Sequence, residues 1–195
     1  MYRKIAITGL SGCDNTLLAL ALSNLTDIPY IRNKTMYEWF RLCKVANSDN
    51  LKWKDLLMIA SFSFFERVAT ESHYDKFISD GMPFSELIWL KSHFEKHHPN
   101  KKNDDCNRIA ENLEKTIAFY SAQQYDIIIH AYTESDIYIN DLHTLLYKKY
   151  NIPWKEYNAE NLEEVIRKIV NDFQFRIWTT VESAICQAKM DIFKI

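Results

Sequence analysis

Glycine is scarce in this sequence: the 195 residues hold three, Gly9, Gly12 and Gly81, where an average composition would give roughly 14. The four cysteines lie far apart and form no Cys-x-x-Cys pair, which argues against a zinc site and favours free thiols in a reducing compartment. No apolar run approaches the ~18 residues of a membrane-spanning helix. We therefore expect a cytoplasmic protein with no membrane contact.

An excess of either charge is also missing. The chain carries 24 basic and 26 acidic residues, a net charge of -2, and no long run of one sign. Nucleic acid is therefore not an expected partner. The chain is 47% hydrophobic, which suits one folded domain that buries a full core.

Short apolar runs alternate with helical patterns along the chain. Residues 4–8 and 126–131 are rich in isoleucine, and residues 76–79 form a third run, as in buried parallel strands. This alternation predicts an α/β fold with three layers: a parallel central sheet of about five strands, flanked by helices. In the helix over residues 54–70 we expect an inward face with these residues: Leu57, Ile59, Ala60, Phe62, Phe64, Phe65 and Val68.

The last 22 residues differ from the rest, so we divide the chain into residues 1–173 and a C-terminal helix over residues 174–195. Phe175, Trp178, Val181, Ile185 and Met190 lie on related faces of this predicted helix. We expect the helix to pack on its own domain. The alternative is a subunit interface in a homodimer.

Two of the three glycines fall in the turn between the first strand and the first helix, where backbone N–H groups meet phosphate in nucleotide-binding folds. Against the pattern G-x-x-x-x-G-K-[ST], residues 9–16 match at Gly9 and Thr16, but Asp14 replaces the second glycine and Asn15 replaces the lysine. We expect this loop to bind the phosphates of ATP or GTP, through Gly9, Leu10, Ser11, Gly12, Cys13, Asp14, Asn15 and Thr16. The alternative is a tight turn without a ligand.

Asp80 ends the third apolar run and precedes Gly81. A carboxylate at the carboxyl end of a parallel strand can hold Mg²⁺ or accept the proton of a substrate hydroxyl, and the hydroxyl of Thr16 can also hold Mg²⁺. Thr16 and Asp80 are therefore the predicted metal ligands. An ordinary Asp-Gly turn is the alternative for Asp80.

Together the segments "KIAITGLSGCDNTLLALALSNL", "FISDGMPFSELIW", "YDIIIHAYTES" and "NIPWKEYNAENLEEVIRKI" resemble the small P-loop nucleoside and nucleotide kinases of the ribosylnicotinamide-kinase and AAA-like NTPase type. The resemblance spans about residues 4–170. It implies a catalytic Asp80, ATP over the loop, and an acceptor nucleoside, nucleotide or small metabolite facing Asp80. It further implies a lid over residues 133–144 and acceptor contacts from Glu66 and Arg67, for which a solvated surface pair is the alternative.

The sequence departs from this family where positive charge is needed. The loop lysine is Asn15, and residues 133–144 contain His143 but no arginine. Lys34 and Lys91 are candidates to compensate for the missing lysine. For four arginines that could also supply charge we expect surface salt bridges instead: Arg32, Arg41, Arg67 and Arg108. Because phosphoryl transfer depends on positioned positive charge, we favour a nucleotide-binding protein with weakened catalysis. An active phosphotransferase and a scaffold that binds no nucleotide are the alternatives.

Overall fold

A five-stranded, all-parallel sheet forms the centre of the protein, in the order β2-β3-β1-β4-β5. The computed structural model describes residues 2–9, 15–45, 51–97, 104–132 and 137–194. The strands are β1 (Lys4–Gly9), β2 (Tyr30–Ile31), β3 (Phe77–Asp80), β4 (Ile127–Tyr132) and β5 (Trp154–Asn158). The predicted fold class is thus confirmed, and the three predicted runs lie side by side at the centre as β3, β1 and β4.

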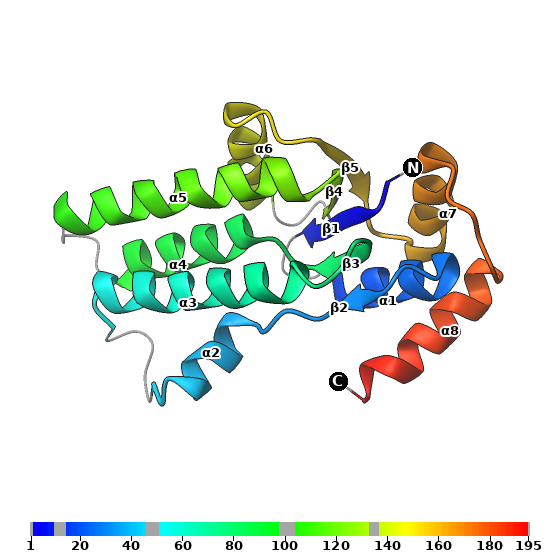
Figure 1. Ribbon diagram of the computed structural model, residues 1–195, viewed down its shortest axis with the longest axis horizontal. Coiled ribbons are helices and arrows are strands. Elements are labelled where there is room, and N and C mark those ends of the chain that lie inside the picture. The colour runs from blue at the N-terminus through cyan, green and yellow to red at the C-terminus, as the bar shows by residue number, and fades with distance from the viewer. Residues whose placement is uncertain (1, 10–14, 46–50, 98–103, 133–136, 195) are drawn as a thin grey trace.

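Helices cover both faces of the sheet (Figure 1). One group comprises α2 (Met36–Leu42), α3 (Trp53–Glu71), α4 (Pro83–His97), α5 (Asp104–Gln124) and α6 (Ile137–Lys149). The other group comprises α1 (Asn15–Thr26), α7 (Leu162–Phe173) and α8 (Val181–Ile192). In Figure 1, α3, α4 and α5 run parallel to one another on the left and extend beyond the sheet, while α1, α7 and α8 gather on the right.

Alternation along β1 explains why the chain needs both layers. Ile5 and Ile7 join the core cluster beneath α1, α7 and α8, whereas Ala6 joins the cluster beneath α3, α4 and α5. All three side chains are buried. A strand that is apolar on both sides must be covered on both sides, which a parallel sheet with crossover helices achieves.

The C-terminal segment packs against α1. Val181, Ala184 and Ala188 of α8 are buried in the same cluster as α1, and the small alanines let the two helices approach closely. Phe175, in the segment between α7 and α8, is also buried, but Trp178 and Met190 are more than half exposed. The predicted apolar face of residues 174–195 is therefore right for Phe175 and Val181 and wrong for Trp178 and Met190.

The predicted inward face of α3 is also partly wrong. Leu57, Ile59 and Phe64 are buried, but Phe62 and Phe65 are 51% and 62% exposed. Nearly every position of this helix between 56 and 65 is apolar or small, so periodicity cannot tell its two faces apart. Within the described residues, none of the helices has the length and apolarity needed to cross a membrane.

Candidate functional site

Thr16 and Asp80 meet at the carboxyl edge of the sheet. Thr16 lies in the first turn of α1 and Asp80 is the last residue of β3, which pairs directly with β1. The Thr16 hydroxyl donates to Asp80 Oδ2 over 2.6 Å, and the Tyr30 hydroxyl donates to the same oxygen over 3.1 Å. A hydroxyl and a carboxylate oxygen thus converge, which is a donor set that Mg²⁺ accepts directly or through water.

A cavity of about 300 Å³ opens beside this pair. Such a position, outside the carboxyl ends of the strands, is where open parallel sheets bind their ligands. The cavity is lined from the start of α1, the end of β2, α3 and the β3–α4 turn, by Asn15, Thr16, Asn33, Lys34, Thr35, Arg67, Asp80, Gly81, Met82, Ser85 and Glu86. Of the predicted site residues, it brings together Asn15, Thr16, Arg67 and Asp80.

The predicted phosphate loop lies mostly outside the described residues, since Leu10, Ser11, Gly12, Cys13 and Asp14 are not described. Its first glycine has a structural explanation: a Cβ on Gly9 would lie 2.1 Å from the carbonyl oxygen of Ala131, its neighbour on β4. Packing therefore demands glycine at position 9 whether or not a phosphate binds.

Asn15 occupies the lysine position of the motif. Its Oδ1 is buried and accepts no hydrogen bond within the part of the chain that the structure describes. Buried acceptors are nearly always satisfied, so this oxygen has capacity for a donor. It is an acceptor where the motif requires a cation.

Arg67 is buried at the back of the cavity, with a side chain only 2% exposed. Its Nη2 donates to Glu86 Oε1 over 2.7 Å, and its Nη1 donates to the Gly81 carbonyl over 3.1 Å and lies 3.7 Å from Glu71 Oε1. Burial alone would lower the pKa of Arg67, but the neighbouring charges, Glu86 foremost, outweigh it and raise that pKa. The prediction of a surface salt bridge for Arg67 is therefore wrong.

Glu71 continues this network into the core. It accepts hydrogen bonds from Ser79 (2.6 Å), Tyr125 (3.0 Å) and Tyr120 (2.8 Å). Burial first, and then the charge of Glu71, raises the pKa of Tyr125 and of Tyr120, so both phenols stay protonated donors. The network fixes the strand that carries Asp80, because Ser79 directly precedes it.

Glu66 does not share the position of Arg67. It forms a half-exposed ion pair with Lys34 and is not among the residues that line the cavity. Lys34 lines the cavity but is held by this pair. Arg32 pairs with Glu38 at the surface, as predicted. Lys91 lies elsewhere, in a depression beside Glu114 on α5.

Sequence reasoning missed a polar chain on the other side of the cavity. Ser85 Oγ lies 2.7 Å from Thr8 Oγ1 and 2.9 Å from His143 Nε2, and His130 packs beside His143 with ring centroids 5.2 Å apart. Both histidines are buried. His143 was expected in the lid; residues 133–136 of that segment are not described, and His143 itself belongs to α6 and the core. The sequence feature that could have indicated this polar chain is His130, a polar residue within the isoleucine-rich strand β4.

No family model and no curated protein sequence matches the chain. Its fold matches that of a deoxyadenosine kinase from M. mycoides with bound dATP, with a TM-score of 0.63 and 15% identity over 88% of this chain and 99% of that one. The same enzyme with the products dCMP and dCDP gives a TM-score of 0.59 and 17% identity over 88% and 98%. The YorR protein of Bacillus subtilis, in complex with phosphorylated GDP, gives only 0.47, with 15% identity over 87% and 95%.

These matches extend over almost the whole length of the deoxyadenosine kinase, so the chain shares its overall fold. At this level of identity they show the fold alone. What the site does must therefore be argued from its own residues.

Proposed function

We propose that this protein binds a nucleotide at the cavity between α1 and β3, and that loss of the loop lysine weakens phosphoryl transfer. The observation that carries the proposal is the convergence of Thr16 and Asp80 beside a 300 Å³ cavity at the carboxyl edge of the sheet. The deoxyadenosine kinase that shares this fold holds dATP. We expect the segment from Gly9 to Thr16 to supply backbone N–H groups to phosphate, because these do not depend on side-chain identity.

Thr16 and Asp80 are the residues that would hold Mg²⁺. Their oxygens fit this hard cation, and the phosphates would complete its shell. The bound ion would neutralise part of the phosphate charge. In an intact loop a lysine shares this task, but here Asn15 stands at that position. Asp80 is also the group that would accept a proton from an acceptor hydroxyl. Arg67 lines the cavity and Glu66 does not, so Arg67 is the one of the two that we propose for an acceptor contact.

The charges around the cavity argue against efficient catalysis. Lys34 and Arg67 are balanced by Asp80 and Glu86, and both cations are already engaged by carboxylates. Asn15 adds no charge. Removing one positioned group from a phosphoryl-transfer site commonly lowers the rate by orders of magnitude, so we infer binding without ordinary turnover. We propose residues 1–173 as the nucleotide-binding unit and residues 174–195 as a C-terminal segment, of which the helix is α8 (Val181–Ile192).

A thermal-shift experiment tests this function. We expect ATP, GTP or dATP with Mg²⁺, at 100 times its dissociation constant, to add ~2.7 kcal/mol of stability, which raises the melting temperature by several degrees. Thr16→Val and Asp80→Asn should remove the shift. Thr116→Val is the matched control, because the Thr116 hydroxyl donates to the Asn112 carbonyl of its own helix.

If none of these nucleotides shifts the melting temperature, or if the shift survives in both site variants, nucleotide binding at this cavity is refuted. A shift combined with no turnover across a panel of nucleosides supports a binding protein over an active kinase.

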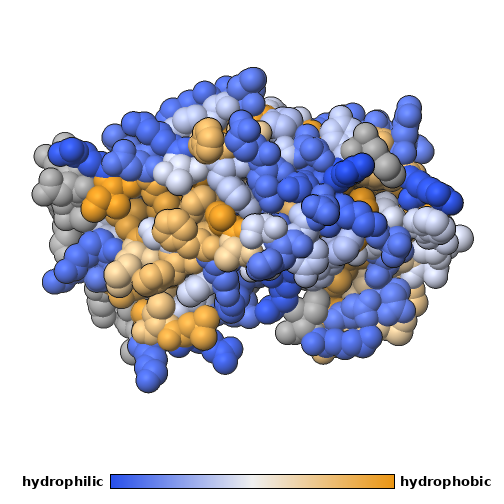
Figure 2. All heavy atoms as spheres, viewed as in Figure 1, coloured by the Kyte–Doolittle hydropathy of each residue, from blue (hydrophilic) through white to orange (hydrophobic). Residues whose placement is uncertain are grey.

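One further observation favours self-association as a second function. Met58, Phe62 and Phe65 of α3 and Phe119 of α5 expose half or more of their side chains, and Figure 2 shows hydrophobic residues gathered over this part of the molecule. We infer that this face associates with a second copy of the chain. The two functions are compatible, because the face does not include the residues that line the cavity.

A further inference from the structure

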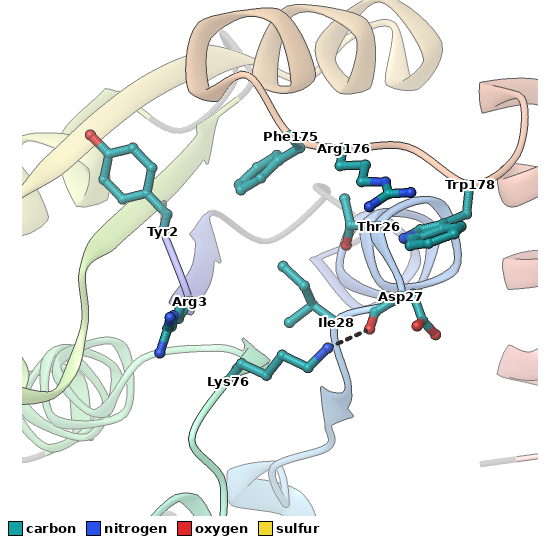
Figure 3. Close-up of a pocket in the computed structure, with 9 residues that line it drawn as sticks. All are labelled: Tyr2, Arg3, Thr26, Asp27, Ile28, Lys76, Phe175, Arg176 and Trp178. Carbon is teal, nitrogen blue, oxygen red and sulfur yellow. Dashed lines mark hydrogen bonds between the residues drawn. The ribbon is translucent and has the colours of Figure 1, made fainter.

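A second cavity, of about 330 Å³, lies at the opposite edge of the sheet from Asp80 (Figure 3). Arg3 directly precedes β1 and Lys76 directly precedes β3, so both lie where the strands begin. The end of α1 and the segment that joins α7 to α8 close the cavity. The Trp178 backbone N–H donates to the Leu25 carbonyl over 2.9 Å, which fixes that segment to α1.

Positive charge dominates the lining. Arg3, Lys76 and Arg176 come from three separate segments, and Asp27 is the one carboxylate among the lining residues. Across the described residues, no ion pair includes any of these three cations. An anion that enters would thus displace no described carboxylate partner from the cations that line the cavity.

The position of one cation is explained by the end of α1, because positive charge is favourable near the carbonyl groups of a helix C-terminus. Lys76 Nζ donates to the Asp27 carbonyl over 3.3 Å. Within the described parts of the chain, the guanidinium groups of Arg3 and Arg176 donate to no carbonyl. The nearby carboxylate of Asp126 accepts hydrogen bonds from the backbone N–H groups of Arg3 and Lys4, over 2.6 and 3.0 Å. These bonds are to the main chain and not to the Arg3 guanidinium.

Apolar and aromatic surfaces complete the site. Phe175 and Ile28 are buried and point into the space between the cations in Figure 3. Trp178 lies at the rim, 59% exposed, with the Arg176 guanidinium 4.2 Å from its ring centroid. A ring that enters here would contact aromatic faces while its charged group meets the arginines.

We propose that this cavity binds a small aromatic anion, whose charged group lies among Arg3, Lys76 and Arg176 and whose ring packs on Phe175 and Trp178. Its volume is at the lower end of the range of small-molecule sites, about 300–1,000 Å³, which fits a ligand no larger than a mononucleotide. The shared chemistry is a ring with a phosphate ester or a carboxylate.

Calorimetric titration of the full chain separates these two sources of negative charge. The probes are 1-naphthyl phosphate, 1-naphthoate and the uncharged 1-naphthol. We expect at least one anion to bind at least tenfold more tightly than 1-naphthol, and more weakly as salt increases. The tighter of the two anions identifies the charged group that the site prefers.

Variants locate the binding. Arg3→Gln combined with Arg176→Gln should weaken the tighter anion at least tenfold, since hydrogen bonds to charged groups are the strong ones. Lys189→Gln, at an exposed position of α8, is the matched control. Both arginines are exposed, so the melting temperature should stay unchanged. The variants Thr16→Val and Asp80→Asn should leave this affinity unaltered, which distinguishes the cavity from the proposed nucleotide site.

The proposal is overturned if neither anion binds more tightly than 1-naphthol. It is equally overturned if the double arginine variant retains full affinity, or if Thr16→Val abolishes the binding of 1-naphthyl phosphate.

Discussion

Arg67 contacts both a carboxylate that lines the candidate site, Glu86, and a carboxylate in the core, Glu71. It faces two carboxylates, Glu86 on α4 and Glu71 on its own helix, and the hydroxyls around Glu71 supply the donors that a single guanidinium cannot. The sequence shows Glu71 four residues after Arg67, an ordinary surface spacing. Glu86 lies 19 residues away, and only the tertiary fold brings it close.

Replacement of Arg67 by methionine should destabilise the protein by about 3–5 kcal/mol, because it leaves buried carboxylates without their cation. Arg32→Met is the matched control: its pair with Glu38 is exposed, and such pairs contribute about 0–1 kcal/mol. Urea unfolding of both variants measures the difference. Equal losses in the two variants would contradict the buried network.

The loop offers a second test at residue scale, through the two motif positions that depart from the phosphate-binding pattern. Asp14→Gly combined with Asn15→Lys rebuilds the motif. ATP should then bind more tightly by ~1.5–3 kcal/mol, the contribution of a hydrogen bond to a charged group. Calorimetry on parent and variant measures this gain. If the variant folds normally and binds ATP no better than the parent, the turn between β1 and α1 is not a phosphate loop.

At the scale of elements, the sequence predicted strands better than helix faces. The isoleucine runs of β1 and β4 are apolar on both sides, which is typical of central strands in a parallel sheet. The sequence therefore predicts that both strands lie at the centre of the sheet. In α3 the same apolarity is ambiguous: the pattern predicts Phe62 and Phe65 in the core, but both side chains are exposed. The Thr16–Asp80 pair was predictable, because Asp80 lies at the carboxyl end of one strand and Thr16 follows the carboxyl end of a strand expected to be its neighbour. The contact of Ser85 with His143 was not, because these residues lie 58 positions apart in sequence on two different helices.

The C-terminal segment gives a test for an element. A chain that ends at Phe173 loses α8 and exposes the α1 surface that Ala184 and Ala188 cover. We expect a lower melting temperature and loss of monodispersity, because this apolar surface would then face water. A milder variant, Ala184→Asp, should act in the same direction, since that side chain is 1% exposed. If the shortened chain is as stable and monodisperse as the full chain, α8 contributes nothing to the fold.

At the scale of the whole molecule, polar and apolar surfaces are separated. The candidate nucleotide cavity lies at one edge of the sheet, the cationic cavity lies at the other, and the exposed apolar face lies on α3 and α5, the helices that extend beyond the sheet in Figure 1. α3 and α5 are in direct contact, since the Phe64 and Tyr120 rings pack edge to face with centroids 5.5 Å apart. The exposed apolar side chains therefore lie on two helices that are direct neighbours.

The apolarity of this face favours a second copy of the chain as its partner. Aromatic side chains bury ~150–250 Å² each, so the four half-exposed side chains supply roughly 300–500 Å². That is about half of the ~800 Å² that each partner contributes to a standard interface. A twofold axis would place the same surface of each protomer against the other, so apolar meets apolar. We therefore predict a dimer in which α3 and α5 of both copies pack together.

Phe62→Ser combined with Phe65→Ser should break this dimer. Each buried aromatic contributes about 1.5–3 kcal/mol, and a twofold contact loses two from each protomer, so the dissociation constant should rise at least 100-fold. Phe193→Ser is the matched control, because Phe193 is 90% exposed and lies at the end of α8. Light scattering coupled to gel filtration measures the mass. The double variant should be a folded monomer while the parent and the control remain dimers. A parent chain that stays monomeric at its highest soluble concentration would contradict the prediction.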